Sequence, residues 1–330
     1  MKRITFILTL AVLCLCVSCK KEKVTPDNNQ QQQEEPTPTD EGALNGVFSI
    51  GANKQVKFSK GNLQYQATTK TWRFAENQYN FVGAANANAS ESYGGWIDLF
   101  GWATSGWNCG NTYYMPYDRN FVDSYTQGMG YGPLPAGERS LNGEFANCDW
   151  GVYNAISNGG NQAGLWRTMT GEEWTYLFKT RPNADQKYGI ACIEGNNGMV
   201  VLPDNWTLPE GCTFNCGLGT GDGMEYYAAQ NYYSSEQWAK MEANGALFLP
   251  AGGGYNGDDK EVTYVGEVGR YWTINCVTEA ASWMFYDWCA YAMYFDSQYM
   301  DPCDLNSPRY YGRSVLVRMQ TAEIGLPMLA

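Results

Sequence analysis

The chain has 330 residues and a formal net charge of −12 at neutral pH, although only 17% of its residues are charged. An acidic surface repels phosphate groups, which argues against nucleic acid as a partner. The sequence contains no histidine, which removes Ser-His-Asp and Cys-His catalysis and every zinc site that needs imidazole. Enzymes that use carboxylates or cysteines remain open, without the commonest general base near neutral pH.

The N-terminus has the pattern of an export signal. Lys2 and Arg3 form a positively charged start, and residues 4–17 form an apolar stretch that is too short to span a bilayer. Ser18 is a small residue of the kind that signal processing needs just before the cleavage point. The pattern predicts that the protein leaves the cytoplasm.

Residues 16–19, Cys-Val-Ser-Cys, resemble a lipobox. We therefore expect residues 1–18 to be a signal peptide and Cys19 to be acylated and to become the new N-terminus. The alternative is an ordinary secretion signal cut near Ser18. The lipobox interpretation predicts a bacterial cell-envelope protein anchored by lipid in a membrane, the outer membrane in particular, with its body facing either the periplasm or the cell surface.

A polar tail follows the signal. Residues 20–40 contain no aromatic side chain and a single aliphatic one, Val24. Such a segment cannot bury enough apolar surface to offset the entropy of ordering it. We predict a disordered tether over residues 19–45 and a single folded domain over residues 46–330.

The first part of the predicted domain reads as a β-meander, because apolar and polar residues alternate with period two. The strands are expected at residues 47–50, 56–59, 63–66 and 72–74. The next segment, 86–145, is rich in Gly, Asn and aromatic residues and shows no sustained period. We expect ordered loops there, packed by their own aromatic rings.

Three short helices are predicted, each beginning at a side chain that can cap its first turn. Asp149 caps the first, Thr170 and Glu173 form a capping box at the second, and Ser234 caps the third. The helices are expected over residues 150–156, 170–178 and 234–242. Further strands are expected at 247–249, 269–274, 290–295 and 313–318. Strands, isolated helices and strands again predict an α+β fold.

Several segments together resemble a known family. They are Val56-Lys57-Phe58-Ser59, Gly164 to Thr170 with Glu173-Trp174, Leu202-Pro203-Asp204, Phe248 to Gly253, Gly269-Arg270-Tyr271-Trp272 and Gly312 to Arg318. Their order is similar to that of the Fibrobacter succinogenes major paralogous domain, which occurs in secreted lipoproteins. The resemblance implies a C-type lectin-like fold with antiparallel strands, in the branch that includes the formylglycine-generating (sulfatase-modifying) enzymes.

The resemblance implies a fold more than an activity. The calcium-binding triplets of sugar-binding C-type lectins are absent, and the C-terminal cysteines are not set in the pattern of the formylglycine-generating enzymes, so we transfer no catalytic residue. We expect a non-enzymatic envelope protein that binds a glycan or a protein through its loops, as an adhesin or a component of a surface appendage. The alternatives are a cysteine-dependent enzyme of that branch and a purely structural envelope subunit.

Aromatic residues on the predicted loops are the candidate ligand-binding residues. Exposed rings stack on sugar faces or anchor protein partners, whereas rings that pack the loops internally bind nothing. The candidates are Trp96, Trp102, Trp107, Tyr113 and Tyr114.

Two further features are candidate sites. Asp258, Asp259 and Glu261 lie on a Gly-containing loop and offer carboxylates to calcium, although the spacing is not that of an EF-hand and an exposed acidic turn is the alternative. No other cofactor is expected. Eight cysteines follow the signal region, and Cys212 and Cys216 are close enough to form a disulfide in an oxidising compartment. Free, partly buried thiols are the alternative.

Overall fold

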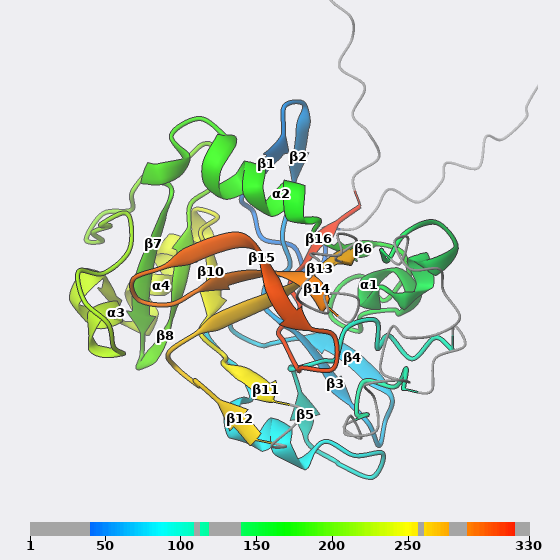
Figure 1. The fold of residues 1–330 in the computed structure, drawn as a ribbon. Coiled ribbons are helices and arrows are strands. Elements are labelled where there is room, and N and C mark those ends of the chain that lie inside the picture. Colours follow the sequence, from blue (N-terminus) through cyan, green and yellow to red (C-terminus); the bar gives the residue numbers. More distant parts are fainter. Residues whose placement is uncertain (1–39, 109–112, 119–139, 257–260, 277–288, 321–330) are drawn as a thin grey trace, which may run out of the picture. The chain divides into compact units, whose positions relative to one another are not determined.

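Figure 1 shows the computed structural model, which describes residues 40–108, 113–118, 140–256, 261–276 and 289–320. All of them belong to one compact unit that spans residues 38–330. The predicted signal peptide and the lipidation site Cys19 lie outside the described residues. In the part of the chain that is described, no helix has the length and apolar character needed to cross a bilayer.

The folded unit begins earlier than the sequence predicts. Gly42, Ala43 and Leu44 are buried, and Ala43 forms a β-bridge with Ser59. The predicted end of the tether at residue 45 is therefore several residues too late, because the side chains of Ala43 and Leu44 join the apolar core.

The fold is a mixed one, with mostly antiparallel sheets and a few short helices, and this confirms the α+β class (Figure 1). The largest sheet has the order β10-β8-β7-β9, in which only β7 and β9 run parallel. Its strands are β7 (Tyr188–Ile193), β8 (Asn196–Val201), β9 (Tyr232–Tyr233) and β10 (Leu247–Pro250). A second sheet has the order β13-β14-β15, with strands β13 (Gly269–Cys276), β14 (Cys289–Phe295) and β15 (Met300–Pro308).

The remaining strands form small separate sheets, and the N-terminal ones among them do not form the predicted continuous meander. The pairs and triplets are β1 (Phe48–Gly51) with β2 (Lys54–Val56); β3 (Leu63–Gln66) with β4 (Thr71–Phe74) and β5 (Trp96–Ile97); β6 (Trp166–Thr168) with β16 (Val317–Met319); and β11 (Gly254–Asn256) with β12 (Glu261–Thr263). The meander is interrupted because the backbone N–H groups of Ser59 and Leu63 bond to the carbonyl oxygens of Val317 and Val315.

The three predicted helices are present, and their caps are those expected. Asp149 accepts a hydrogen bond from the N–H of Gly151, and both Thr170 and Ser234 form complete capping boxes. The α-helices are α1 (Trp150–Tyr153), α2 (Gly171–Thr175), α3 (Glu225–Gln230) and α4 (Ser235–Ala243). A π-helical turn η3 (Tyr176–Thr180) continues α2, and the 3-10 turns are η1 (Gly83–Asn88), η2 (Gly143–Cys148) and η4 (Ala184–Gln186).

The β13-β14-β15 sheet separates the two largest hydrophobic clusters. Tyr271 and Met293 point to one side and pack with Trp174, whereas Trp272 and Ala292 point to the other side and pack with a different cluster. Because side chains alternate along a strand, residues two positions away share a face. This alternation decides which residues of the sheet remain open to solvent.

Candidate ligand-binding face

The five aromatic side chains that the sequence suggests as ligand-binding residues are more buried than the side chains of a binding surface. Trp102 is only 1% exposed, its Nε1 donates to the carbonyl oxygen of Thr273 over 2.8 Å, and the guanidinium of Arg309 lies 5.2 Å from its ring. Of the two alternatives, internal packing holds for Trp102, because this side chain is part of the core.

The other four rings are half-buried. Trp96 lies beneath the guanidinium of Arg73, 3.9 Å from the ring centre, and Trp107 and Tyr113 pack against hydrophobic clusters. The carbonyl of Tyr114 accepts a hydrogen bond from the N–H of Gly106 over 2.9 Å. The aromatic residues of this region thus largely pack the loops that carry them.

The calcium and disulfide candidates are not assembled among the described residues. Asp258 and Asp259 lie outside them, Glu261 is exposed on β12, and within the described ranges no group of three His, Cys, Asp or Glu side chains is arranged to hold a metal ion. Cys212 and Cys216 are both free thiols in the structure, so the predicted bond is not formed. Cys212 is buried and its thiol donates to the carbonyl of Gln237 over 3.6 Å, whereas Cys216 is exposed.

A different aromatic cluster is open to solvent, at the end of the β13-β14-β15 sheet away from Cys276 and Cys289. In the sheet register Arg270 pairs with Tyr294 and Tyr294 pairs with Asp301, so the three side chains form a row on one face. The neighbouring row on the same face, which contains Trp272, is buried. One half of this face is therefore covered by the core, and the other half is open.

Two exposed tyrosines complete the open half. Tyr264 is 54% exposed and Tyr299 is 56% exposed. The guanidinium of Arg270 lies 5.9 Å from the ring of Tyr264 and 5.2 Å from the ring of Tyr294, and the rings of Tyr294 and Tyr299 are 6.0 Å apart at 49°. We call this surface the tyrosine face; it consists of Tyr264, Arg270, Tyr294, Asp296, Tyr299 and Asp301.

The turn between β14 and β15 holds its tyrosine in place through one carboxylate. Asp296 Oδ1 accepts hydrogen bonds from the N–H groups of Gln298 and Tyr299, over 2.8 and 2.7 Å. The N–H of Asp296 in turn donates to the carbonyl of Tyr299 over 2.9 Å. A turn closed by its own Asp side chain fixes the position of the ring that follows.

Tyr264 is held in an unfavourable backbone conformation. Its φ is 57°, in the left-handed region that a bulky residue rarely adopts. Its carbonyl accepts hydrogen bonds from the N–H groups of Glu267 and Val268, both over 3.1 Å, which keep the turn closed. Such conformations cost about 1–3 kcal/mol and concentrate at functional sites, which is why we include this ring in the candidate site.

The two phenols at the β14-β15 turn are neutral hydrogen-bond donors at physiological pH. Burial, together with the hydrogen bond to Asp296, raises the pKa of Tyr294 to about 12, and its hydroxyl donates to Asp296 Oδ2 over 2.8 Å. The carboxylate of Asp301 raises the pKa of Tyr299, whose hydroxyl donates to Asp301 Oδ2 over 3.4 Å. Both carboxylates keep further lone pairs for other donors.

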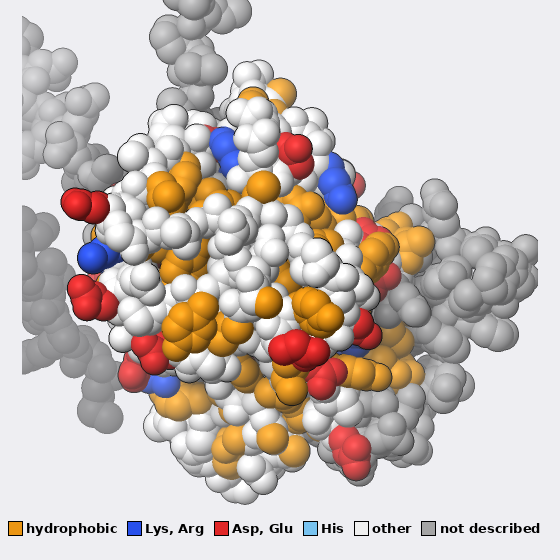
Figure 2. All heavy atoms as spheres, turned by 90° about the vertical axis from the view of Figure 1, so that its left-hand side faces the viewer, with side chains coloured by type: hydrophobic (Ala, Val, Ile, Leu, Met, Phe, Trp, Pro, Cys, Tyr) orange, Lys and Arg blue, Asp and Glu red, His pale blue; other side chains and the backbone are white. Residues whose placement is uncertain are grey.

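The β14-β15 turn lies at the left of Figure 1, and Figure 2 turns this side of the molecule toward the viewer. Hydrophobic side chains, tyrosines included, gather there in several separate groups, and acidic side chains lie next to some of them (Figure 2). Separate groups of this kind fit the recognition of a polar ligand better than a broad apolar contact.

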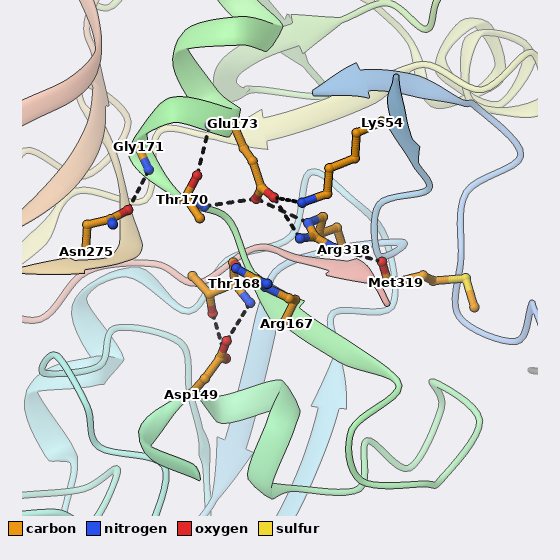
Figure 3. Close-up of polar contacts among 10 residues, drawn as sticks. All are labelled: Lys54, Asp149, Arg167, Thr168, Thr170, Gly171, Glu173, Asn275, Arg318 and Met319. Atoms are coloured by element: carbon orange, nitrogen blue, oxygen red, sulfur yellow. Dashed lines mark hydrogen bonds and ion pairs between the residues drawn. The ribbon is translucent and has the colours of Figure 1, made fainter. Parts of the chain in front are cut away.

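A second charged cluster lies inside the molecule, between α2, β16 and the β1-β2 hairpin (Figure 3). Glu173 accepts from Arg318 Nε over 3.2 Å and from Arg318 Nη2 over 2.7 Å, and it also accepts from Lys54. Burial alone would raise the pKa of Glu173, but the hydrogen bonds from Arg318, Lys54 and the N–H of Thr170 lower it. We define Lys54, Glu173 and Arg318 as the buried ion cluster.

The buried ion cluster connects distant parts of the chain, because Glu173 and Arg318 are 145 positions apart. Both side chains are almost fully buried, at 6% and 3% exposure, whereas Lys54 is 46% exposed. With its carboxylate fully occupied and its arginine enclosed, the cluster offers a ligand little to bind. Its role is to hold the capped helix against the last strand.

No family model matches this chain, and no curated protein or solved structure matches it either. The tyrosine face is thus interpreted from its own geometry and chemistry. The sequence does contain a signal for it, because Arg270 is the only charged residue of an otherwise apolar and polar strand. Tyr264 lies six positions before Arg270, but Tyr294 and Asp301 lie more than twenty positions after it, and only the strand register brings these two to Arg270.

Proposed function

We propose that the protein is a non-enzymatic lipoprotein of the bacterial cell envelope, anchored in the outer membrane through Cys19, that binds a glycan at the tyrosine face. It would act as an adhesin or as a component of a surface appendage. The observation that carries this proposal is the open half of the β13-β14-β15 sheet, where exposed rings and carboxylates stand side by side. Sugar rings pack their C–H faces on aromatic rings, and sugar hydroxyls donate to carboxylates.

The buried ion cluster supports the proposal of a C-type lectin-like fold of the Fibrobacter succinogenes major paralogous type. Two segments that carry the resemblance meet in this cluster, and a third packs beside it. Glu173, in the capped helix, bonds to Arg318 in the closing strand, and the neighbouring ring of Trp174 packs against Tyr271 of the aromatic strand β13 at 6.4 Å between ring centres. Motifs that are far apart in the sequence thus contact one another.

The cysteines favour binding over cysteine chemistry. Cys276 and Cys289 are buried. Burial, and then the carboxylates of Glu172, Asp301 and Asp304, raise the pKa of the Cys303 thiol to about 12. A thiol that stays protonated at neutral pH is a poor nucleophile, so an enzyme of the formylglycine-generating type is the weaker alternative.

The test is binding of the full chain, in detergent, to a broad glycan array, with calcium and with a chelator. The variant Tyr299→Ala removes one exposed ring of the tyrosine face, and Tyr232→Ala is the matched control, because Tyr232 is also 56% exposed but lies on β9. We expect the glycan signal to fall at least tenfold in Tyr299→Ala and to persist in Tyr232→Ala.

The other outcomes select between alternatives. Binding that needs calcium would restore the Asp258–Asp259–Glu261 loop as a metal site. Binding that is equal in both tyrosine variants would place the ligand elsewhere on the molecule. The absence of any binding signal from the wild-type chain, with calcium and with chelator, would contradict glycan binding and favour a structural envelope subunit with protein partners.

A further inference from the structure

The surroundings of the tyrosine face are strongly acidic. Asp296 and Asp301 belong to it, and Asp304 is close enough to raise the pKa of both Tyr294 and Tyr299. Glu267 belongs to the turn of Tyr264, because its N–H donates to the Tyr264 carbonyl over 3.1 Å. Asp222 lies between Gly221 and Gly223, which both bond to the hydroxyl of Ser297, the neighbour of Asp296. Five carboxylates, from the β12-β13 connection, the loop before α3, the β14-β15 turn and β15, therefore lie in the tyrosine face or on segments that contact it.

Among the described residues, two arginines lie near these carboxylates, Arg270 half-buried and Arg313 fully buried. Arg270 lies between the rings of Tyr264 and Tyr294. Arg313 is only 2% exposed, and its Nη1 donates to the carbonyl of Gly312 over 3.1 Å. The carboxylates outnumber these two cations, and they are half-buried or, as in Glu267 and Asp222, exposed. A ligand that approaches the tyrosine face meets a net negative potential.

We infer that the glycan bound at the tyrosine face carries free amines, so that the ligand is an amino sugar polymer rather than an acidic or N-acetylated one. This inference rests on the proposed function. An ammonium group is attracted by the carboxylates and also by the faces of tyrosine rings. An N-acetylated sugar has the same ring but no charge, and a uronic acid carries a charge that the site repels.

The experiment compares three oligosaccharides of equal length with the full chain in detergent: a β-linked glucosamine oligomer, its fully N-acetylated form and a galacturonic acid oligomer. Dissociation constants are measured by calorimetry at slightly acidic pH and at low and high salt. Because exposed charge pairs each contribute modestly, we expect the glucosamine oligomer to bind about tenfold more tightly than its N-acetylated form. The uronic acid oligomer is expected not to bind. High salt should reduce the ratio between the affinities for the glucosamine oligomer and for its N-acetylated form.

Two variants test which carboxylates cause the preference for the glucosamine oligomer. Asp301→Asn with Glu267→Gln keeps the size of both side chains but removes two charges, and should reduce the preference to about threefold or less. Glu236→Gln, on the exposed surface of α4, is the matched control and should leave the preference unchanged. A thermal melt of each variant shows whether it is folded.

The outcomes separate the two proposals. Equal affinity for the glucosamine oligomer and its N-acetylated form would overturn the inference and leave glycan binding intact. A preference that survives in Asp301→Asn/Glu267→Gln would also overturn it, because the charge would then lie elsewhere. If none of the three oligomers bound and the wild-type chain gave no signal on the glycan array, the proposed function itself would be overturned.

Discussion

The buried ion cluster and the tyrosine face use similar groups in opposite ways. In the buried ion cluster, the carboxylate of Glu173 receives four hydrogen bonds from Thr170, Lys54 and Arg318. In the tyrosine face, the carboxylates of Asp296 and Asp301 bond mainly to their own turn and strand and remain partly open. A carboxylate enclosed by its partners stabilises the fold, and one that faces solvent is available to a ligand.

The comparison predicts that changes in the buried ion cluster alter stability and changes in the tyrosine face alter binding. The largest effect is expected for Arg318→Met, which leaves Glu173 buried without its main partner. Breaking a buried ion pair from one side costs about 3–5 kcal/mol, so we expect a loss in the free energy of unfolding of that order, measured by urea denaturation.

The control for Arg318→Met is Lys54→Met, which removes the other cation of the same carboxylate. Lys54 is half exposed, so its loss should cost about 1 kcal/mol or less. Equal losses in the free energy of unfolding would mean that burial of the cation does not determine how much it stabilises the protein.

The second prediction concerns pH. Because the pKa of Glu173 is lowered in the folded state from its ordinary 4.5, its charge contributes stability above that value. This contribution is lost as the pH falls through the folded-state pKa. We expect Glu173→Gln to be less stable than the wild type at neutral pH and to lose less stability on acidification, as followed by urea denaturation at a series of pH values. Parallel pH curves for the two proteins would contradict this assignment.

The third prediction contrasts two stacked arginines. Arg270→Met removes the guanidinium between Tyr264 and Tyr294, and Arg73→Met removes the one that lies over Trp96. Each stack is partly exposed, so each change should cost about 0.5–1 kcal/mol of stability. Only Arg270→Met should alter glycan affinity, and a similar change in both variants would argue against the tyrosine face as the site.

Helices α1, α2 and α4 could be predicted from the sequence because their signals are local, whereas α3 begins without a capping side chain and was not predicted. The capping boxes Thr170–Glu173 and Ser234–Gln237 each span four residues, and both are present in the structure. The hairpin of β7 and β8 was not predicted, since most residues of both strands are buried. Strands buried on both faces lack the alternation that identifies a strand in sequence.

The candidate site could not be predicted because it depends on strand register. The row of Arg270, Tyr294 and Asp301 exists only after β13, β14 and β15 have paired. Aromatic content alone misplaces the site: Trp102, in the loops richest in Trp, is enclosed by the core. Composition thus locates rings along the chain, and packing decides which of them reach solvent.

The smallest effect on stability is expected from substitution of the cysteines, one of which is buried and one exposed. Cys216 is exposed and Cys212 is buried, and both are free in the structure. A maleimide should therefore react quickly with Cys216 in the native chain without a reductant, and Cys216→Ser should remove that fast phase while leaving stability within about 0.5 kcal/mol. If the fast phase appeared only after reduction, Cys216 would be disulfide-bonded, and the pair with Cys212 would return as the explanation. Enclosure of Cys212 by α4 instead predicts that it reacts only when the protein unfolds, at a rate that denaturant increases.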